Sequence, residues 1–218
     1  MNIRYFLPLC VAFVLIANIA DSQVFYGRRV PRYRTQQRPR QHQYTEPFQP
    51  SVNISVGYGF PNGDKYLLPS YYNAYSGSIS QNGPVTGSID YRFNRRMSIG
   101  ALVTHGTVNA PYYDYSNSNI PVFNYKMESW SFMLNIMQYM TGSKAVTPYL
   151  RTAIGVNSWT QGYTDAYGNK IAMANAQLPD LAYQVGLGAQ IKLSKNAGFF
   201  LEAGYGKYIL HTGLTLKF

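Results

Sequence analysis

The sequence predicts an all-β fold, an eight-stranded antiparallel up-and-down transmembrane β-barrel that follows a disordered N-terminal arm. Charged residues make up 13% of the chain, about half of the roughly 25% that is usual in soluble proteins. Apolar and polar residues alternate along eight segments, which is the period of a β-strand with two different faces. Short and long connections alternate between these segments, as they do in outer-membrane barrels.

Residues 1–22 have the parts of an export signal. Arg4 supplies a positive start, an apolar stretch follows, and small residues before Gln23 fit a cleavage site. The alternative is an uncleaved membrane anchor, which would need a longer apolar stretch. Cys10, the single cysteine of the sequence, lies inside this segment, so we expect a mature chain without disulfides or Cys-based zinc sites.

Residues 23–50 are predicted to form a disordered, basic periplasmic arm. Within 24–50, six arginines stand against one acid, Glu46, which gives a net charge of +5. The arm has few apolar residues, so it cannot bury enough surface to offset the entropy of ordering. It is either a solvated linker or a contact for an anionic envelope polymer or lipid phosphates, and it lacks the interleaved aromatics of a nucleic-acid groove. The arginines are Arg28, Arg29, Arg32, Arg34, Arg38 and Arg40.

Residues 51–218 alternate with a period of two. In the first segment Val52, Ile54 and Val56 share one face, and small polar residues and glycines share the other. The eight predicted strands cover about 51–60, 84–93, 97–106, 124–139, 146–158, 180–193, 198–206 and 208–218. Their number is even and most are close to the 9–11 residues that a tilted membrane-spanning strand needs.

The connections between the strands are predicted to differ in length at the two ends of the barrel. Short turns are expected at 94–96, 141–145 and 194–197, and long loops at 61–83, 107–123 and 159–179. The last connection, around Gly206, looks like a tight hairpin. Because outer-membrane barrels have short periplasmic turns and longer extracellular loops, we expect both termini to lie on the periplasmic side.

The end of the chain alternates apolar residues up to a terminal aromatic. These residues are Leu210, Leu214, Leu216 and Phe218. With this end, residues 51–218, about three quarters of the chain, resemble the small eight-stranded outer-membrane β-barrel families, such as the outer-membrane protein A transmembrane domain and protein X-like barrels. The resemblance implies that the barrel-assembly machinery reads the chain end as its signal. It leaves the activity open, because these families include adhesins, structural anchors, narrow channels and a few enzymes.

A soluble β-sandwich or lipocalin-like barrel is the alternative fold. Its apolar face would point inward and its polar face would meet water. Gly57, Gly186 and Gly204 lie on the polar faces, so that exterior would carry almost no charge. The glycine-rich polar faces therefore favour the membrane barrel.

Several charged residues fall on the face that would line the lumen. They are Asp90, Arg92, Arg151, Lys192 and Glu202. An eight-stranded barrel is barely wide enough for its own side chains, and buried charges must be paired. We therefore predict a salt-bridged plug built around Asp90, Arg92, Arg151 and Glu202. The alternative is a narrow, gated path for solutes.

The sequence shows no enzyme motif and no metal-site spacing. His105 with Asp114 is a candidate acid–base pair, His42 lies in the arm and His211 faces the predicted lumen. None of the usual nucleophile, metalloprotease or phosphate-loop patterns occurs, and the acidic residues lack calcium-loop spacing. We expect no enzymatic activity, no cofactor and no metal.

Tyrosines gather in the predicted outer loops. They are Tyr66, Tyr71, Tyr72, Tyr75, Tyr112, Tyr113, Tyr115, Tyr163 and Tyr167. Tyrosine is a rigid, amphipathic contact residue that suits recognition of a glycan or a protein. The alternative interpretation is an interfacial aromatic girdle together with packing within the loops.

Together these observations predict an exported, monomeric, non-enzymatic protein of a Gram-negative outer membrane. Its expected role is structural or adhesive, with tyrosine-rich loops outside and a plugged lumen. Its expected partners are outer-membrane lipid and the barrel-assembly machinery, with an anionic envelope polymer at the arm and no nucleic acid. Two alternatives stay open, a narrow channel for small or apolar solutes and an accessory subunit of an envelope secretion or assembly complex.

Overall fold

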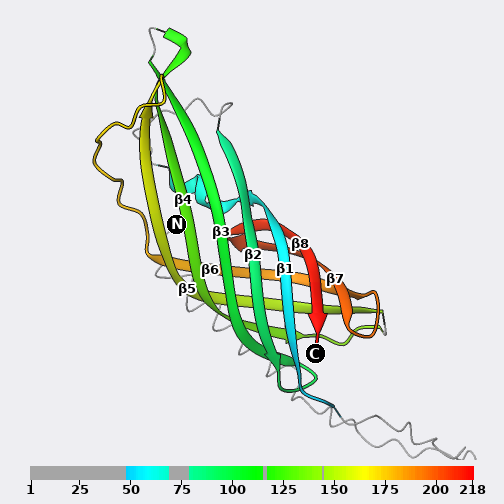
Figure 1. The fold of residues 1–218 in the computed structure, drawn as a ribbon. Helices are drawn as coiled ribbons and strands as arrows, with labels where there is room; N and C mark the ends of the chain where they lie inside the picture. The colour runs from blue at the N-terminus through cyan, green and yellow to red at the C-terminus, as the bar shows by residue number, and fades with distance from the viewer. Residues whose placement is uncertain (1–47, 69–78, 115–116, 144) are drawn as a thin grey trace, which may run out of the picture. The chain divides into compact units, whose positions relative to one another are not determined.

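The computed structural model describes residues 48–68, 79–114, 117–143 and 145–218. The predicted export signal and the arginines of the basic arm lie outside these residues. Eight strands form a closed barrel in which each strand pairs antiparallel with its neighbours and β1 pairs with β8 (Figure 1). The predicted fold class, an eight-stranded antiparallel barrel, is confirmed.

The strands differ strongly in length. They are β1 (Ser51–Asn62), β2 (Ser80–Arg92), β3 (Met97–Asp114), β4 (Asn117–Tyr139), β5 (Val146–Asp165), β6 (Leu181–Lys192), β7 (Ala197–Gly206) and β8 (Tyr208–Lys217). A single turn of 3-10 helix, η2 (Gly63–Leu67), follows β1. In the described part of the chain, no helix is long and apolar enough to cross a membrane.

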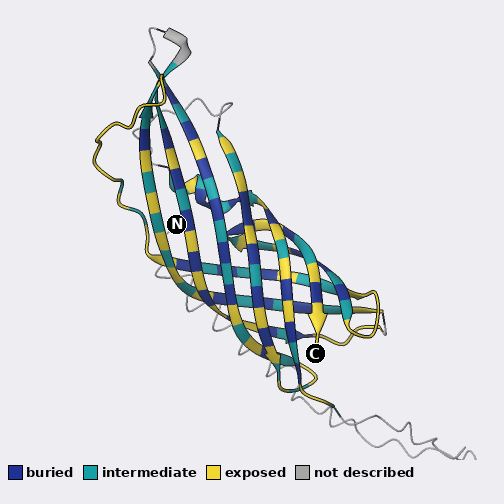
Figure 2. Cartoon of the chain, viewed as in Figure 1, coloured by how far each residue is buried: buried dark blue, intermediate teal, exposed yellow. Residues whose placement is uncertain are grey.

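Buried and exposed residues alternate along the strands (Figure 2). Most of the large exposed side chains are apolar, whereas many of the buried ones are polar. On β4, Met133 and Asn135 are buried, whereas their chain neighbours Phe132 and Leu134 are 52% and 53% exposed. Such a closed belt of large exposed apolar side chains suits hydrocarbon and not water. The soluble-barrel alternative required the opposite arrangement and is wrong.

The barrel has two unlike ends. The turn end has the short connections 93–96, 140–145 and 193–196, together with Phe218. The loop end has η2, the hairpin link between β3 and β4, the segment 166–180, and Lys207 between β7 and β8.

Two of the predicted long loops are largely strand. Residues predicted as the loop 107–123 continue β3 and β4 as a hairpin, and 159–165 continue β5. The first predicted loop, 61–83, begins with the last two residues of β1, which η2 follows, and its residues from Ser80 onward belong to β2. Pro111 and the asparagines of this hairpin disfavour a strand, but β3 and β4 stay paired through it, with register shifts at Tyr112/Tyr113 and Tyr113/Asp114.

The outward face of the long strands changes from apolar to polar at one layer. This layer contains His105, Trp130 and Ser158, which lie side by side on β3, β4 and β5. On one side of it β4 presents Phe132 and its apolar neighbours, and on the other side it presents Lys126 and Glu128. The strand β3 runs nine residues beyond the layer, about 30 Å of extended chain. The sheet β3–β4–β5 therefore projects past the apolar band (Figure 1).

Candidate functional site

An ion pair occupies the centre of the lumen. Arg151 on β5 and Glu202 on β7 are 2% and 1% exposed, and Arg151 Nε lies 3.2 Å from Glu202 Oε2. Strand β6 lies between them and places Gly186 opposite Arg151 and Gly188 opposite Glu202. A Cβ on Gly186 would collide with the Glu202 carboxylate. The glycines on the polar face thus leave room for the charged side chains that fill the lumen.

Two tyrosines complete the surroundings of this carboxylate. Tyr149 Oη donates to Glu202 Oε2 at 3.0 Å, and Tyr208 Oη donates to Oε1 at 3.0 Å. The Arg151 guanidinium carbon also lies 5.8 Å from the centre of the Tyr149 ring, within the range of a cation–π contact. Both carboxylate oxygens therefore have partners, as a buried charge requires.

Asp90 is also buried, but neutral donors satisfy it. Asn135 Nδ2 donates to Oδ1 at 2.6 Å, and Ser88 Oγ donates to Oδ2 at 3.0 Å. We refer to Asp90, Arg151 and Glu202, with Tyr149 and Tyr208, as the central layer. Together with the neighbouring His211, whose Nε2 lies 2.6 Å from Thr86 Oγ1, these side chains fill the middle of the barrel.

The structure does not bring Arg92 or Lys192 into this layer, so the predicted network is wrong at these two positions. The Arg92 guanidinium lies over the Tyr139 ring at 3.9 Å and donates to the carbonyls of Asn94 and Arg95. Lys192 is exposed at the turn end. Both are the last residues of their strands, where water can solvate a charge and no buried partner is needed.

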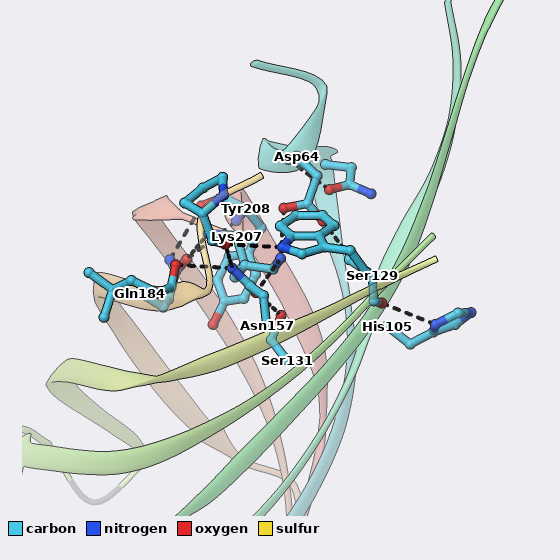
Figure 3. Close-up of polar contacts among 12 residues, drawn as sticks. Asp64, His105, Ser129, Ser131, Asn157, Gln184, Lys207 and Tyr208 are labelled. Atoms are coloured by element: carbon cyan, nitrogen blue, oxygen red, sulfur yellow. Dashed lines mark hydrogen bonds and ion pairs between the residues drawn. The ribbon is translucent and has the colours of Figure 1, made fainter. Parts of the chain in front are cut away.

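A second ion pair closes the loop end (Figure 3). Lys207, between β7 and β8, places its Nζ 2.6 Å from Oδ1 of Asp64 on η2. Both side chains are buried. The η2 turn is held over the barrel because Asn62 accepts a hydrogen bond from the Asp64 amide at 3.0 Å and because the Gly63 amide donates to the Lys207 carbonyl at 2.8 Å.

Polar side chains from three strands surround this pair. Ser129 Oγ on β4 donates to Asp64 Oδ2, and Lys207 Nζ also donates to Asn157 Oδ1 on β5 at 3.2 Å. Gln184 Oε1 on β6 accepts from the Lys207 backbone amide at 2.7 Å. The Lys207 ammonium lies 5.0 Å from the Trp159 ring. We call Asp64, Lys207, Ser129, Asn157 and Gln184 the cap layer.

Sequence reasoning missed the cap layer. Asp64 was placed in a long outer loop and Lys207 in a tight hairpin, and neither was a candidate site residue. One local signal existed, because Asn62-Gly63-Asp64 has the pattern of a capped turn. That pattern indicates a turn but not which strand it will contact.

The projecting sheet has its own small core on the face that continues the lumen. The buried members of this core are Val108, Ala110, Tyr112, Tyr125, Met127 and Tyr163. The segment 166–180 covers one side of it, with Leu178 packed against the cluster. Tyr163 Oη donates to the Ala174 carbonyl at 3.2 Å and Trp159 Nε1 to the Pro179 carbonyl at 3.0 Å. This connection is thereby fixed to β5.

The turn at the tip of β5 is held by a carboxylate. The side-chain amide of Asn169 donates to Asp165 Oδ2 at 2.9 Å, and the amides of Tyr167 and Asn169 each donate to Oδ1 at 2.8 Å. The Asn169 side chain and then these backbone donors hold the pKa of Asp165 below its usual range. The carboxylate is therefore charged, and it organises the exposed turn.

The predicted tyrosine contact residues divide into two groups. Tyr66 and Tyr167 are 67% and 91% exposed, whereas Tyr112 and Tyr163 are each 4% exposed. Tyr112 stacks on Phe123 at 4.8 Å, so these two buried tyrosines support the sheet and offer no contact surface. Tyr113 is half-buried. The remaining predicted tyrosines, Tyr71, Tyr72, Tyr75 and Tyr115, lie outside the described residues.

The candidate acid–base pair of the sequence is not formed. His105 stacks on Trp130 with ring centres 4.3 Å apart, and its Nε2 lies 3.8 Å from Glu128 Oε1. Asp114 is nine residues further along the same strand, about 30 Å away. Among the described residues, no group of three or more His, Cys, Asp or Glu side chains could hold a metal ion.

A closed eight-stranded antiparallel barrel with an outward apolar belt, a polar lumen and short turns at one end has the plan of an outer-membrane β-barrel. The chain is a protein of that structural class, with transmembrane strands. The apolar residues Leu210, Leu214, Leu216 and Phe218 all lie exposed on its outside.

No protein-family model matches the chain, and no curated protein matches it in sequence. Solved structures with a similar fold include Ail, the attachment invasion locus protein of Yersinia pestis, in complex with the heparin analogue sucrose octasulfate, at 10% identity and a TM-score of 0.43, covering 78% of this chain and 97% of that one. A de novo designed transmembrane β-barrel has 15% identity and a TM-score of 0.41, covering 77% and 95%. Acinetobacter baumannii CarO2 has 13% identity and a TM-score of 0.38, covering 77% and 98%.

Proposed function

We propose that the chain is a non-enzymatic outer-membrane protein with a closed lumen, whose projecting sheet is displayed outside the cell as a structural or adhesive surface. The observation that carries this proposal is the length of β3, β4 and β5 beyond the His105–Trp130–Ser158 layer. A sheet with a polar outside, in which β3 continues for about 30 Å of extended chain beyond the apolar band, serves no purpose in spanning the bilayer. In this proposal the loop end is extracellular and the turn end, with both termini, is periplasmic.

The remaining sequence predictions belong to the same proposal. Residues 1–22 would direct export, the chain end at Phe218 would be read by the barrel-assembly machinery, and residues 23–50 would remain in the periplasm. Partition into outer-membrane fractions, with a shift in electrophoretic mobility on boiling, tests the export and folding parts. A soluble product without a mobility shift would contradict them.

The closed lumen is supported by its contents. The central layer and the cap layer each hold a buried ion pair, Arg151–Glu202 and Asp64–Lys207, and an eight-stranded barrel has little space beyond its side chains. We expect the purified protein to give no discrete conductance steps in planar bilayers. Reproducible single-channel openings from the heat-modifiable, folded form would instead establish the narrow-channel alternative.

The display role predicts that adhesion depends on the projecting hairpin. Thr107 lies opposite Glu128, so replacing residues 108–127 with Asn-Gly would join these strands through a two-residue turn. We expect this variant to keep its mobility shift, because the band of lipid-facing residues is intact, and to lose binding of cells to glycan or matrix surfaces.

Two single substitutions test whether a loss of binding comes from the displayed surface or from a less stable barrel. Tyr167→Ala removes an exposed side chain of the loop end, and Tyr205→Ala removes one of similar size that is 58% exposed on the barrel wall. Reduced binding is expected for Tyr167→Ala alone. Binding that survives removal of the hairpin would rule out the adhesive role and leave the structural one.

A further inference from the structure

The charges of the barrel are divided unequally between its two ends. The described cationic residues at the turn end are Arg92, Arg95, Arg96, Lys192, Lys195 and Lys217. The acid nearest along the chain is Asp90 for the three arginines and Glu202 for the three lysines, and both acids are buried in the central layer. At the loop end the sequence instead places Lys65, Lys126, Lys170 and Lys207 with Asp64, Asp114, Glu128, Asp165 and Asp180. The turn end is therefore strongly positive and the loop end is not.

Four of these cations line one pocket. The pocket lies at the turn-end mouth of the lumen, has a volume of about 240 Å³, and includes Arg92, Lys192, Lys195 and Lys217 among its lining residues. Asn53 and Thr215 contribute polar side chains to the same wall. Within the described residues, no carboxylate lines it. The pocket thus gathers positive charge and hydrogen-bond donors without a compensating acid.

The four cations have different local roles. Arg92 is fixed by the Tyr139 ring and by the Asn94 and Arg95 carbonyls. The described side chains contain no ion-pair partner within 4.0 Å of Lys192, Lys195 or Lys217. One anchored guanidinium beside flexible ammonium groups attracts an anion. Several like charges around one space favour an anion with more than one negative charge, such as phosphate, over a single carboxylate.

The pocket also lies at the depth of lipid headgroups. Arg92, Lys192 and Lys217 are each followed in the chain by a large apolar residue, and these neighbours are Phe93, Leu193 and Phe218, with exposures of 42%, 64% and 69%. Because successive residues of a strand point to opposite faces, the cations face the mouth of the lumen while their neighbours face lipid. The pocket is therefore at the edge of the apolar belt, within reach of both a lipid headgroup and a soluble anion.

We propose that this turn-end pocket is a binding site for a phosphate anion, held by Lys192, Lys195 and Lys217 beside Arg92. The source of the phosphate is either the headgroup of an anionic phospholipid or free inorganic phosphate, and both present the same chemistry to the pocket. The site is independent of the adhesive role, since it lies at the opposite end of the barrel from the projecting sheet.

The test titrates inorganic phosphate into the folded full-length protein in zwitterionic micelles and follows backbone amide shifts by NMR. Wild-type protein should respond saturably at residues 194–198, and Lys192→Gln/Lys217→Gln should bind about tenfold more weakly. The matched control is Lys126→Gln/Lys170→Gln, which removes the same charge from the loop end and should bind as wild type. The mobility shift on boiling verifies that each variant is folded.

A second arm identifies the source of the phosphate. In nanodiscs that contain phosphatidylglycerol, a lipid ligand would occupy the pocket and abolish the response to inorganic phosphate, whereas phosphatidylcholine nanodiscs would preserve it. A response that persists in both lipids identifies free phosphate. The proposal is overturned if no saturable response occurs in micelles, if the two double variants weaken binding equally, or if acetate binds as tightly as phosphate.

Discussion

The two buried ion pairs of this barrel have similar chemistry but are held by different parts of the chain. Arg151 and Glu202 of the central layer project from strands whose register fixes both backbones. Asp64 and Lys207 of the cap layer come from a single helical turn and from a one-residue link between strands. The charged groups of both pairs are buried, so each charged side chain depends on its ion-pair partner. The difference is that Asp64 and Lys207 can move apart while the strands stay paired, whereas Arg151 and Glu202 cannot.

The largest effect is expected from breaking the central pair. Glu202→Gln keeps the size of the side chain but leaves the buried Arg151 guanidinium without its ion-pair partner, with only the more distant Asp90 of the same layer as a counter-charge. Loss of one partner of a buried pair costs about 3–5 kcal/mol, and we expect a decrease of that order in the free energy of unfolding. Urea-induced unfolding from phospholipid vesicles, followed by tryptophan fluorescence, measures it.

The matched control removes both charges of the central pair. Arg151→Met with Glu202→Leu replaces the pair with apolar side chains, which is often neutral or stabilising. Most of the lost stability should return, apart from two costs. The hydroxyls of Tyr149 and Tyr208 lose their acceptor, and the buried Asp90 loses the favourable charge of Arg151. If Glu202→Gln is as stable as the wild type, the pair does not hold the central layer together.

The central layer could be predicted from the sequence to a greater extent than the cap layer. The inward position of Asp90, Arg151 and Glu202 follows from two-residue alternation, which is a local property of a strand. The same alternation gave the number of strands and the outward apolar face. It did not give the partners in space, so Arg92 was assigned to the network although its strand ends at the mouth of the lumen.

The loop end was harder to predict because its structure depends on tertiary contacts. Pro111 and the asparagines of the β3–β4 hairpin have low strand propensity, yet pairing over the buried tyrosine cluster keeps them extended. Asp64 acquires its role only when η2 meets the β7–β8 link and β4. No local pattern in the sequence specifies a contact between residues that lie 143 positions apart.

The smaller effect is expected from breaking the cap pair, and it should be local. Asp64→Asn leaves Lys207 without its carboxylate, but the ammonium is at the end of the barrel and can turn to water. The loss in unfolding free energy should be about 1–3 kcal/mol, the cost of one unsatisfied polar partner. Hydrogen exchange should become faster in Gly63–Leu67 and at Lys207, while the amides of the barrel wall keep their protection.

Lys65→Gln is the matched control for this experiment, because Lys65 is on the same helical turn and its ammonium lies 4.9 Å from the centre of the Tyr66 ring. It should exchange as the wild type does. Faster exchange across β7 and β8 in Asp64→Asn would show that the cap pair stabilises the sheet itself, and the distinction between the two layers would then fail. Exchange confined to the helical turn would instead define a cap that can open over a central layer that stays closed, which is the arrangement expected of two ion pairs with unequal backbone support.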